Sequence, residues 1–317
     1  MSSVTSEAAE YRAVTEACGV LDRSTRGKLA LSGGEAKGFL QGQVTNDVEA
    51  LTPGSGCYAA FLTPKGKMLG DLRILDAGEE LLLDTERVAL QALFNMIRRF
   101  SIGYGVALHK RTLERGLVSL IGPTADALLA KAGPLPPTEN SHLLVSVGGF
   151  DARAIRTDVG IDLLCGAADT EALLAALLGL GAVPVGEGVA ECLRVERGRP
   201  RYGIDLDDSV IPQEAGLNAR AVSFTKGCYV GQETVARLHY RGKPNRHLRG
   251  LRCSGPAGTG AEVSFAGRVV GHVASSVESP RLGPIALALV RREAPPGSEV
   301  QVGAEAVSAE VVELPFT

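Results

Sequence analysis

The chain has 317 residues, of which 45% are hydrophobic and 22% charged, ordinary values for a globular protein that exclude a wholly disordered chain. Its 33 basic and 36 acidic residues give a formal net charge of −3, and no run of like charges marks a tail that binds polyanions. Because Trp is absent and aromatic residues make up only 4%, we expect no nucleic-acid partner.

At about 150 residues per domain, the length predicts about two domains. No basic segment followed by an apolar stretch opens the chain, and no apolar run of about 18 residues occurs. We therefore expect neither a signal peptide nor a membrane span, and a cytoplasmic location. The six cysteines form no CxxC pair, so the sequence predicts no metal site and no disulfide framework.

Helices and strands alternate irregularly over the first two-thirds of the chain. Hydrophobic periodicity with Gly and Pro stops predicts helices over residues 5–18, 35–41, 86–98, 123–133 and 169–178. Asp84 is the expected N-cap of helix 86–98, and Val88 lies on its expected buried face. Alternation and turn signals predict strands over residues 29–32, 58–62, 68–75, 81–83, 143–147 and 152–157.

The character of the sequence changes after about Pro244. Five short apolar segments separated by Gly and Pro predict strands over residues 262–265, 268–274, 285–290, 299–302 and 306–313. Short strands with such turns and no helix are typical of a small antiparallel barrel. The expected fold is therefore an α+β body followed by a C-terminal β-barrel.

The segment richest in chemistry is residues 226–234, Lys-Gly-Cys-Tyr-Val-Gly-Gln-Glu-Thr. Gly227 and Gly231 permit a tight turn around Cys228, and a helix is expected to begin near Gly231. A helix N-terminus and the cation of Lys226 both favour the thiolate form of a cysteine, which points to a reactive thiol. The alternative is a plain turn in which the polar residues after Gly231 cap a short helix and the cysteine only packs.

Residues 226–233 resemble the K-G-C-aromatic-aliphatic-G-Q-E signature of the YgfZ family, folate-binding relatives of the glycine-cleavage T-protein that support iron–sulfur proteins. The residues that carry this match are Lys226, Gly227, Cys228, Tyr229, Gly231, Gln232 and Glu233. Residues 39–48, 62–67, 194–200 and 211–217 are similar, in the same order, to F-L-Q-G-Q-x-T-N-D-V, L-T-P-x-G-K, R-x-E-x-G-x-P and I-P-x-E-A-G-L. The resemblance runs from about residue 20 to 290.

The resemblance implies an α+β, three-lobed, ring-like T-protein fold, in which two α/β lobes and a C-terminal antiparallel β-barrel surround a central folate site. It assigns residues 1–50 and 116–243 to the first lobe, 51–115 to the second lobe and 244–317 to the barrel. It also implies tetrahydrofolate as the cofactor.

In the T-protein relatives a Tyr and an Asp thirteen residues apart lie beside the folate, and the resemblance gives these roles to Tyr58 and Asp71. A carboxylate there could hydrogen-bond the folate or stabilise a cationic one-carbon adduct. The match also places Arg194 near the folate. The alternatives are a core aromatic for Tyr58, a solvated strand-edge carboxylate for Asp71 and a surface ion pair for Arg194.

Two departures from the T-protein count against glycine-cleavage chemistry. The T-protein has adjacent aspartates where this chain has Gly70-Asp71. Its pterin-gripping Glu has no counterpart in residues 157–163, where Asp162 is a partial substitute. Cys228, by contrast, is the novelty of the octapeptide.

Residues 239–249 carry four cations and two imidazoles. This basic segment could hold an anionic folate tail or a phosphate-bearing partner. The alternative is a solvated linker between the body and the barrel.

The resemblance predicts a tetrahydrofolate-binding accessory protein for iron–sulfur cluster assembly or repair, and so for cluster-dependent enzymes such as those that modify tRNA. Cys228 is then the key thiol, and iron–sulfur proteins or assembly factors are the partners. The alternative is a folate-dependent aminomethyltransferase or demethylase in which Asp71 serves one-carbon chemistry. A third reading is a non-catalytic scaffold on the same fold.

Overall fold

The computed structural model describes residues 7–317. The chain divides into two compact units. The first comprises the residues through Phe61, Gly70–Ala190 and Thr225–Tyr229, and the second comprises Leu62–Leu69, Glu191–Phe224 and Val230–Thr317. Within the described part of the chain, no helix combines the length and apolarity needed to cross a membrane.

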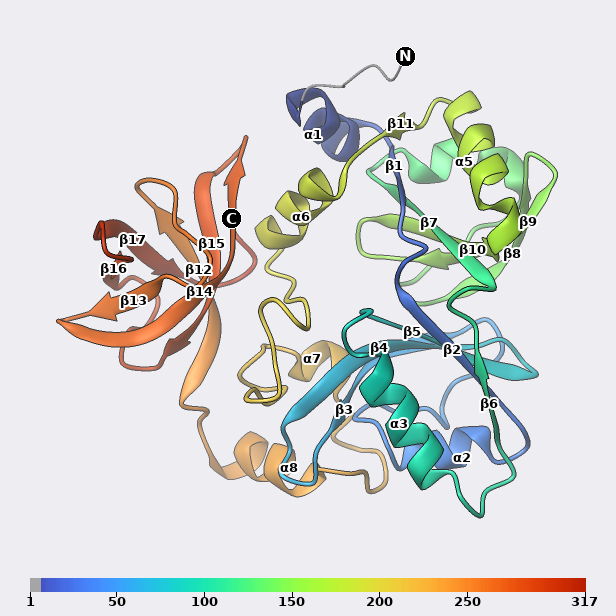
Figure 1. Ribbon diagram of the computed structural model, residues 1–317, viewed down its shortest axis with the longest axis horizontal. Helices are drawn as coiled ribbons and strands as arrows, with labels where there is room; N and C mark the ends of the chain where they lie inside the picture. The colour runs from blue at the N-terminus through green and yellow to red at the C-terminus, as the bar shows by residue number, and fades with distance from the viewer. Residues whose placement is uncertain (1–6) are drawn as a thin grey trace. The chain divides into compact units, whose positions relative to one another are not determined.

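One sheet of the first unit has the strand order β11-β1-β7-β10-β9-β8. Its strands are β1 (Gly19–Asp22), β7 (Arg115–Ile121), β8 (His142–Val147), β9 (Phe150–Arg156), β10 (Gly160–Gly166) and β11 (Val183–Pro184). It is accompanied by α1 (Glu7–Glu16), α4 (Ala125–Leu128) and α5 (Thr170–Gly179), with 3-10 turns at Ala130–Ala132 and Ala167–Asp169 (Figure 1). Helix α5 buries Leu173 and Leu177 completely against the strand residues of this sheet, and this apolar contact holds the layer together.

The other sheet of the first unit has the order β3-β4-β5-β2-β6 and carries the candidate folate residues. Its strands are β2 (Gly27–Ser32), β3 (Gly56–Leu62), β4 (Met68–Asp76), β5 (Glu80–Thr85) and β6 (Ala107–Lys110). Helices α2 (Ala36–Gln41) and α3 (Leu90–Phe100) lie beside it, near β5 and β2 respectively (Figure 1). Ala30, Leu75 and Leu82 of this sheet pack with Ile155 of the first sheet in one apolar cluster.

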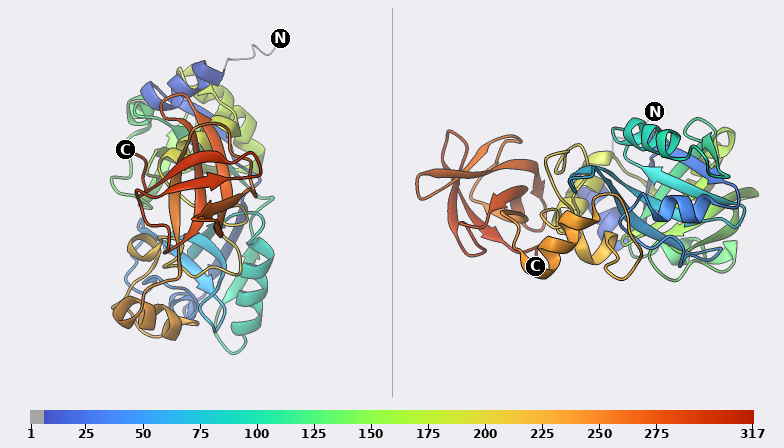
Figure 2. Two further views of the ribbon diagram at one scale, coloured as in Figure 1. Left: turned by 90° about the vertical axis from the view of Figure 1, so that its left-hand side faces the viewer. Right: turned by 90° about the horizontal axis from the view of Figure 1, so that it is seen from below.

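The second unit contains a closed antiparallel barrel of order β12-β15-β14-β13-β16-β17 (Figure 2). Its strands are β12 (Arg246–Cys253), β13 (Glu262–Phe265), β14 (Arg268–Ser279), β15 (Gly283–Arg291), β16 (Glu299–Val302) and β17 (Val307–Val312). Side chains alternate between the interior and the solvent, as in β16, where Val300 and Val302 are buried and their neighbours are exposed. Three further helices are α6 (Glu187–Glu196), α7 (Asn218–Ala221) and α8 (Gln232–Arg241).

The fold class expected from the sequence, two α/β lobes and a C-terminal antiparallel barrel, is confirmed. The hairpin of β8 and β9, the pair β3 and β4, and the five predicted barrel strands all form. The lobe boundaries stay a prediction; β2, from residues before 50, pairs with β5 and β6, from residues after it. The first two residues of predicted helix 5–18 lie outside the described residues.

For helix α3, the start, the N-cap and the buried position of Val88 predicted from the sequence are all wrong. It begins at Leu90 rather than at residue 86, and no side-chain cap bonds its first turn. Asp84 belongs to β5 and forms ion pairs with two arginines instead of capping a helix. Val88, expected on the buried face, is 65% exposed. Asp84 has the side chain of a good N-cap, but in the folded protein it takes part in buried ion pairs, one of them with an arginine far away in the sequence.

Several elements escape sequence analysis. The predicted helix after Pro123 is only the single turn of α4 followed by a 3-10 turn. Strands β1, β6, β7, β10, β11 and β12 and helices α6 and α7 were not predicted. Strand β12 begins within the basic segment and includes its residues 246–249, whose cations hid the alternation of a barrel strand.

Candidate functional site

A phenol and a carboxyl group meet on neighbouring strands of the second sheet. Tyr58 on β3 donates its hydroxyl hydrogen to Oδ2 of Asp71 on β4, at 2.8 Å. Asp71 is 5% exposed, whereas Tyr58 is half-buried. The structure thus brings together the two residues to which the family resemblance gave folate-binding roles, and it makes Asp71 a buried carboxyl rather than a solvated one.

The surroundings of Asp71 raise its pKa toward neutral pH. Burial raises the pKa of Asp71 from 3.8 to about 6, and the hydrogen bond from Tyr58 opposes part of that rise. The carboxylate of Glu86 adds to the rise, and the guanidinium of Arg26 opposes it. A carboxyl with a pKa near 6 can hold or release a proton close to neutral pH, as acid–base groups in active sites do.

The loop of residues 42–48, after α2, fixes the strand that carries Tyr58. The side-chain amide of Asn46 donates to the backbone carbonyl of Tyr58 at 2.8 Å. The Oγ1 of Thr45 accepts from the amide of Ala60 at 2.9 Å, and the amide of Thr45 donates to the carbonyl of Ala60 at 3.0 Å. The polar residues of the early motif therefore position β3 through its backbone.

Gly70, which stands where the T-protein has a further aspartate, is required by packing. Its φ is +155°, and a Cβ there would lie 2.6 Å from the Phe61 ring and 2.7 Å from the Cβ of Ala89. Phe61 is fully buried and cannot retreat into solvent. Asp71 consequently has no adjacent carboxylate on this strand.

Asp162, the partial substitute for the pterin-gripping Glu, is engaged within the protein. Its Oδ2 lies 2.7 Å from the guanidinium of Arg73, and its Oδ1 accepts from the hydroxyl of Ser119 at 2.6 Å. Asp162 is 8% exposed. A pterin would have to displace Arg73 or Ser119 to bond this carboxylate.

A buried ion cluster that sequence analysis missed surrounds Arg73. Arg73 and Arg26 both contact Asp84, at 2.7 Å and 2.8 Å, and Arg26 also pairs with Glu86. Burial alone would raise the pKa of Asp84, but the two guanidinium groups outweigh it and hold the pKa at about 2. The signal in the sequence was an arginine inside the largely apolar strand β4.

Lys226 ties the octapeptide to the loop after α2. Its ammonium donates to the carbonyls of Gln41, Val44 and Asn46, at 2.5, 2.7 and 3.0 Å, and the residue is 8% exposed. Burial lowers the pKa of Lys226 to about 8, although Asp47 opposes the shift. These three charge-assisted bonds join two sequence motifs that lie about 180 residues apart in the chain.

Cys228 is exposed, and Tyr229 beside it is buried. Burial raises the pKa of Tyr229 to about 12, so this phenol stays protonated. A Cβ on Gly227 would meet open space, so close packing does not require glycine there. The cysteine thus projects from a loop whose flanking residues, Lys226 and Tyr229, are both anchored.

Gly231 does require glycine. It precedes α8 with φ +85°, and a Cβ there would lie 2.7 Å from the carbonyl of Thr63 in the 63–66 turn. The helix begins at Gln232, as predicted, followed by Glu233 in the first turn. The N-cap residue is Gly231 itself, and no side-chain hydrogen bond caps the helix there.

Arg194 lies on α6 in the second unit with all five N–H donors used internally. It bonds Glu191 twice, the carbonyl of Arg199, Asp205 at 2.6 Å and the hydroxyl of Ser275 at 2.6 Å. Folate binding by Arg194 would require the exchange of one of these partners, and that role stays a prediction.

The basic segment 239–249 is divided between two elements. His239 lies in α8 and stacks on Phe224 with ring centroids 3.7 Å apart. Arg246 and Arg249 lie in β12 and pair with Glu214 at 3.1 Å and Glu313 at 2.6 Å. Among the described residues, no group of three His, Cys, Asp or Glu side chains could hold a metal ion.

Comparisons with known proteins agree over nearly the whole length. Residues 2–226 match the profile of the GCVT N-terminal domain, and residues 246–317 match that of the glycine cleavage T-protein C-terminal barrel domain. The aminomethyltransferase of Rubrobacter xylanophilus is 32% identical over 97% of this chain and 85% of its own. A putative chloroplastic transferase of Arabidopsis thaliana is 29% identical over 94% of this chain and 71% of its own.

A solved structure of an aminomethyltransferase has the same fold over nearly the whole chain. The glycine cleavage system aminomethyltransferase T of Bartonella henselae superposes with a TM-score of 0.87 at 25% identity, covering 97% of this chain and 88% of that one.

Proposed function

Because the chain belongs to the glycine cleavage T-protein family, carrying both of its domains in order, we propose that it binds tetrahydrofolate and transfers a one-carbon unit from an amine donor to it. The observation that carries the proposal is the buried Asp71 carboxyl, held by Tyr58 and with a pKa near 6. The names of the relatives, aminomethyltransferases at 30–32% identity, support the same chemistry.

The residues present fit a reduced folate. A pterin offers a donor and acceptor edge. The single hydrogen of the Tyr58 hydroxyl is used within the pair, so Asp71 offers the ligand an acceptor when ionised and a donor when protonated. When bound, tetrahydrofolate supplies the nitrogens that accept the one-carbon unit. Asp71 in its ionised form would stabilise positive charge that develops there, and in its protonated form would deliver a proton. Tyr58 keeps the carboxyl oriented.

The decisive test is Asp71→Asn, which keeps the shape and the acceptor of the Tyr58 bond but removes the ionisable group. We expect transfer of a one-carbon unit from an aminomethyl or N-methyl donor to fall by about 100-fold or more, with tetrahydrofolate still bound in calorimetry. Glu278→Gln, an exposed carboxylate of β14, is the control and should retain full turnover. Unchanged turnover in Asp71→Asn contradicts the proposal.

A second candidate function is a folate-binding accessory role for iron–sulfur proteins, in the YgfZ branch of the family. Three observations favour it: Cys228 is exposed on an anchored loop, residue 70 offers no second carboxylate, and Asp162 is held by Arg73. Here the thiol of Cys228, rather than Asp71, is the essential group.

This candidate is tested by complementation. In a strain that lacks its own copy of the gene, Cys228→Ser should fail to restore the activity of a cluster-dependent tRNA-modifying enzyme. Cys253→Ser, a half-buried cysteine of the barrel, should restore it. Full rescue by Cys228→Ser rejects the accessory role, and the Asp71→Asn turnover assay then decides the first proposal independently.

A further inference from the structure

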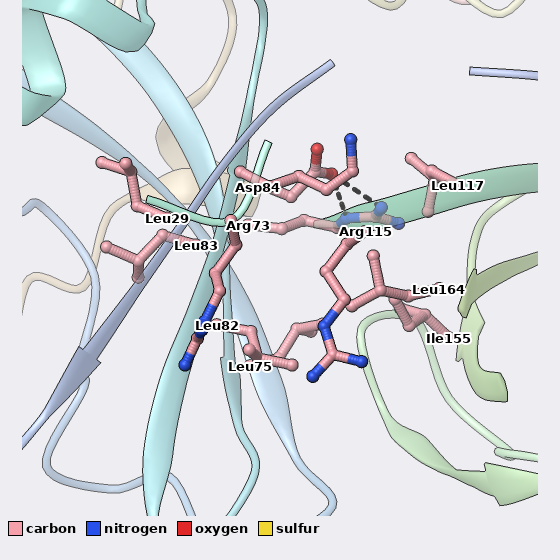
Figure 3. A pocket seen from close by; sticks show the side chains of 12 residues that line it. Leu29, Arg73, Leu75, Leu82, Leu83, Asp84, Arg115, Leu117, Ile155 and Leu164 are labelled. Atoms are coloured by element: carbon pink, nitrogen blue, oxygen red, sulfur yellow. Dashed lines mark hydrogen bonds and ion pairs between the residues drawn. The ribbon is translucent and has the colours of Figure 1, made fainter. Parts of the chain in front are cut away.

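A small cavity lies between the two sheets of the first unit. Its volume is about 20 Å³, which is room for one water-sized or chloride-sized particle. Leucines from both sheets form much of its wall, among them Leu75 and Leu82 of one sheet and Leu164 of the other (Figure 3). An apolar wall suits a weakly hydrated occupant.

The charged groups around this cavity are mostly cationic. Lys28, Arg73, Arg111 and Arg115 line it, against the single carboxylate of Asp84. That carboxylate is already shared between Arg73 and Arg26 (Figure 3 shows its bonds to Arg73). The lining cations therefore exceed the lining anions.

Two of these cations have buried donors left over. The ammonium of Lys28, 3% exposed, donates to the carbonyls of Ser24 and Arg26 at 2.7 and 3.0 Å, which uses two of its three hydrogens. The terminal nitrogens of Arg111 bond Glu114 and Glu80, but its Nε–H is buried without a partner. A buried donor without an acceptor costs about 1–3 kcal/mol, so an acceptor in the cavity is favoured.

Arg115 adds a charge without a counterion. Within residues 7–317, no carboxylate forms an ion pair with it. Its effect reaches Arg153, whose pKa is lowered first by burial and then by the charge of Arg115. Arg153 does not line the cavity, so among the lining guanidinium groups Arg115 is the one whose charge no carboxylate of the described residues balances directly.

We propose that this cavity is a binding site for a small monovalent anion of chloride size, held by donors of Lys28, Arg111 and Arg115. Because strands of both sheets line the cavity, the anion fastens the sheet that carries Asp71 to its neighbour.

The test uses the full chain and two readouts. Crystals grown or soaked with sodium bromide should show an anomalous scattering peak in the cavity. In solution, Tm in 0.2 M sodium chloride should exceed that in 0.2 M sodium gluconate by about 3 °C, with a saturable dependence on chloride. Gluconate is too large for the cavity and is the matched ionic-strength reference.

Variants separate the site from general salt effects. Arg115→Gln, and Arg111→Lys, which removes the Nε donor, should each abolish the difference between chloride and gluconate. Arg268→Gln, an exposed arginine of the barrel, should retain it. No bromide peak in wild-type crystals, or an equal Tm in the two salts, means that the cavity holds water only and overturns the proposal. The crystal experiment needs no variant, so a variant that fails to fold leaves it intact.

Discussion

At the scale of single residues, Asp71 is costly to the fold. A carboxyl that is 5% exposed and has a neutral phenol as its direct partner is expected to resist ionisation. Its neighbours Glu86 and Asp84 add negative charge, which only Arg26 opposes among the groups that act on it most. A fold that needed only packing at this position would be served better by an uncharged residue, so the carboxyl is best explained by function.

This cost gives a pH-dependent prediction. The pKa of Asp71 is raised from 3.8 to about 6 on folding, so between these values the folded state binds more protons and stability falls as pH rises. Asp71→Asn should therefore be more stable than wild type at pH 8, by about 2 kcal/mol, and equal to it near pH 4. Chemical denaturation at the two pH values measures this. A variant less stable than wild type at pH 8 contradicts it.

At the scale of elements, strand β4 is shaped by what lies on each side. Gly70 meets Phe61 and Ala89, Asp71 meets Tyr58, and Arg73 reaches Asp84 and Asp162. By the alternation of the strand, Asp71 and Arg73 lie on one face and the close-packed Gly70 lies on the other. This packing explains the loss of a second aspartate in terms of space rather than chemistry.

Gly70→Ala tests this. The added methyl group would lie 2.6 Å from the Phe61 ring, so we expect a loss of about 2–4 kcal/mol of stability. Gly179→Ala, at the end of α5 with open space around its Cβ position, is the matched control and should change stability by less than about 1 kcal/mol. Urea denaturation of both variants decides; equal midpoints would show that Phe61 moves aside.

At the scale of the whole molecule, acid stability depends on a second buried group, His142 on β8. It is 3% exposed, its Nδ1 lies 3.0 Å from Arg153, and its Nε2 is buried without a partner. Burial, and then the charge of Arg153, lowers the pKa of His142 to about 4. The unfolded chain therefore takes up a proton between about pH 6.5 and pH 4 that the folded chain refuses.

Stability should consequently fall on acidification through that window. Between pH 7 and pH 4.5 we expect wild type to lose about 2 kcal/mol more than His142→Gln, which cannot titrate. The measurement is denaturant unfolding across this range. Because the contribution of Asp71 has the opposite sign, the double variant with Asp71→Asn should add the two effects if the sites are independent. Parallel curves for wild type and His142→Gln would contradict the assignment.

The sequence by itself determined the features that depend on short-range pattern. Alternation and turn residues placed β3, β4, β8, β9 and most of the barrel, because the side-chain period of a strand is visible in a few residues. The glycine at 231, which the helix start and the 63–66 turn both require, was likewise visible. The family resemblance of the sequence, rather than its local pattern, pointed to Tyr58 and Asp71, whose hydroxyl and carboxyl oxygens lie 2.8 Å apart in the structure.

Only the tertiary structure decided what each charged group contacts. Nothing local in the sequence shows that Asp84 pairs with two arginines instead of capping α3. Nor does it show that every N–H donor of Arg194 bonds a group within the protein, or that Lys226 donates to carbonyls about 180 residues earlier in the chain. Burial and long-range partners set these outcomes, and both depend on how strands distant in sequence come together. For the same reason the sequence did not show that the basic segment 239–249 contains the end of α8 and the first half of strand β12.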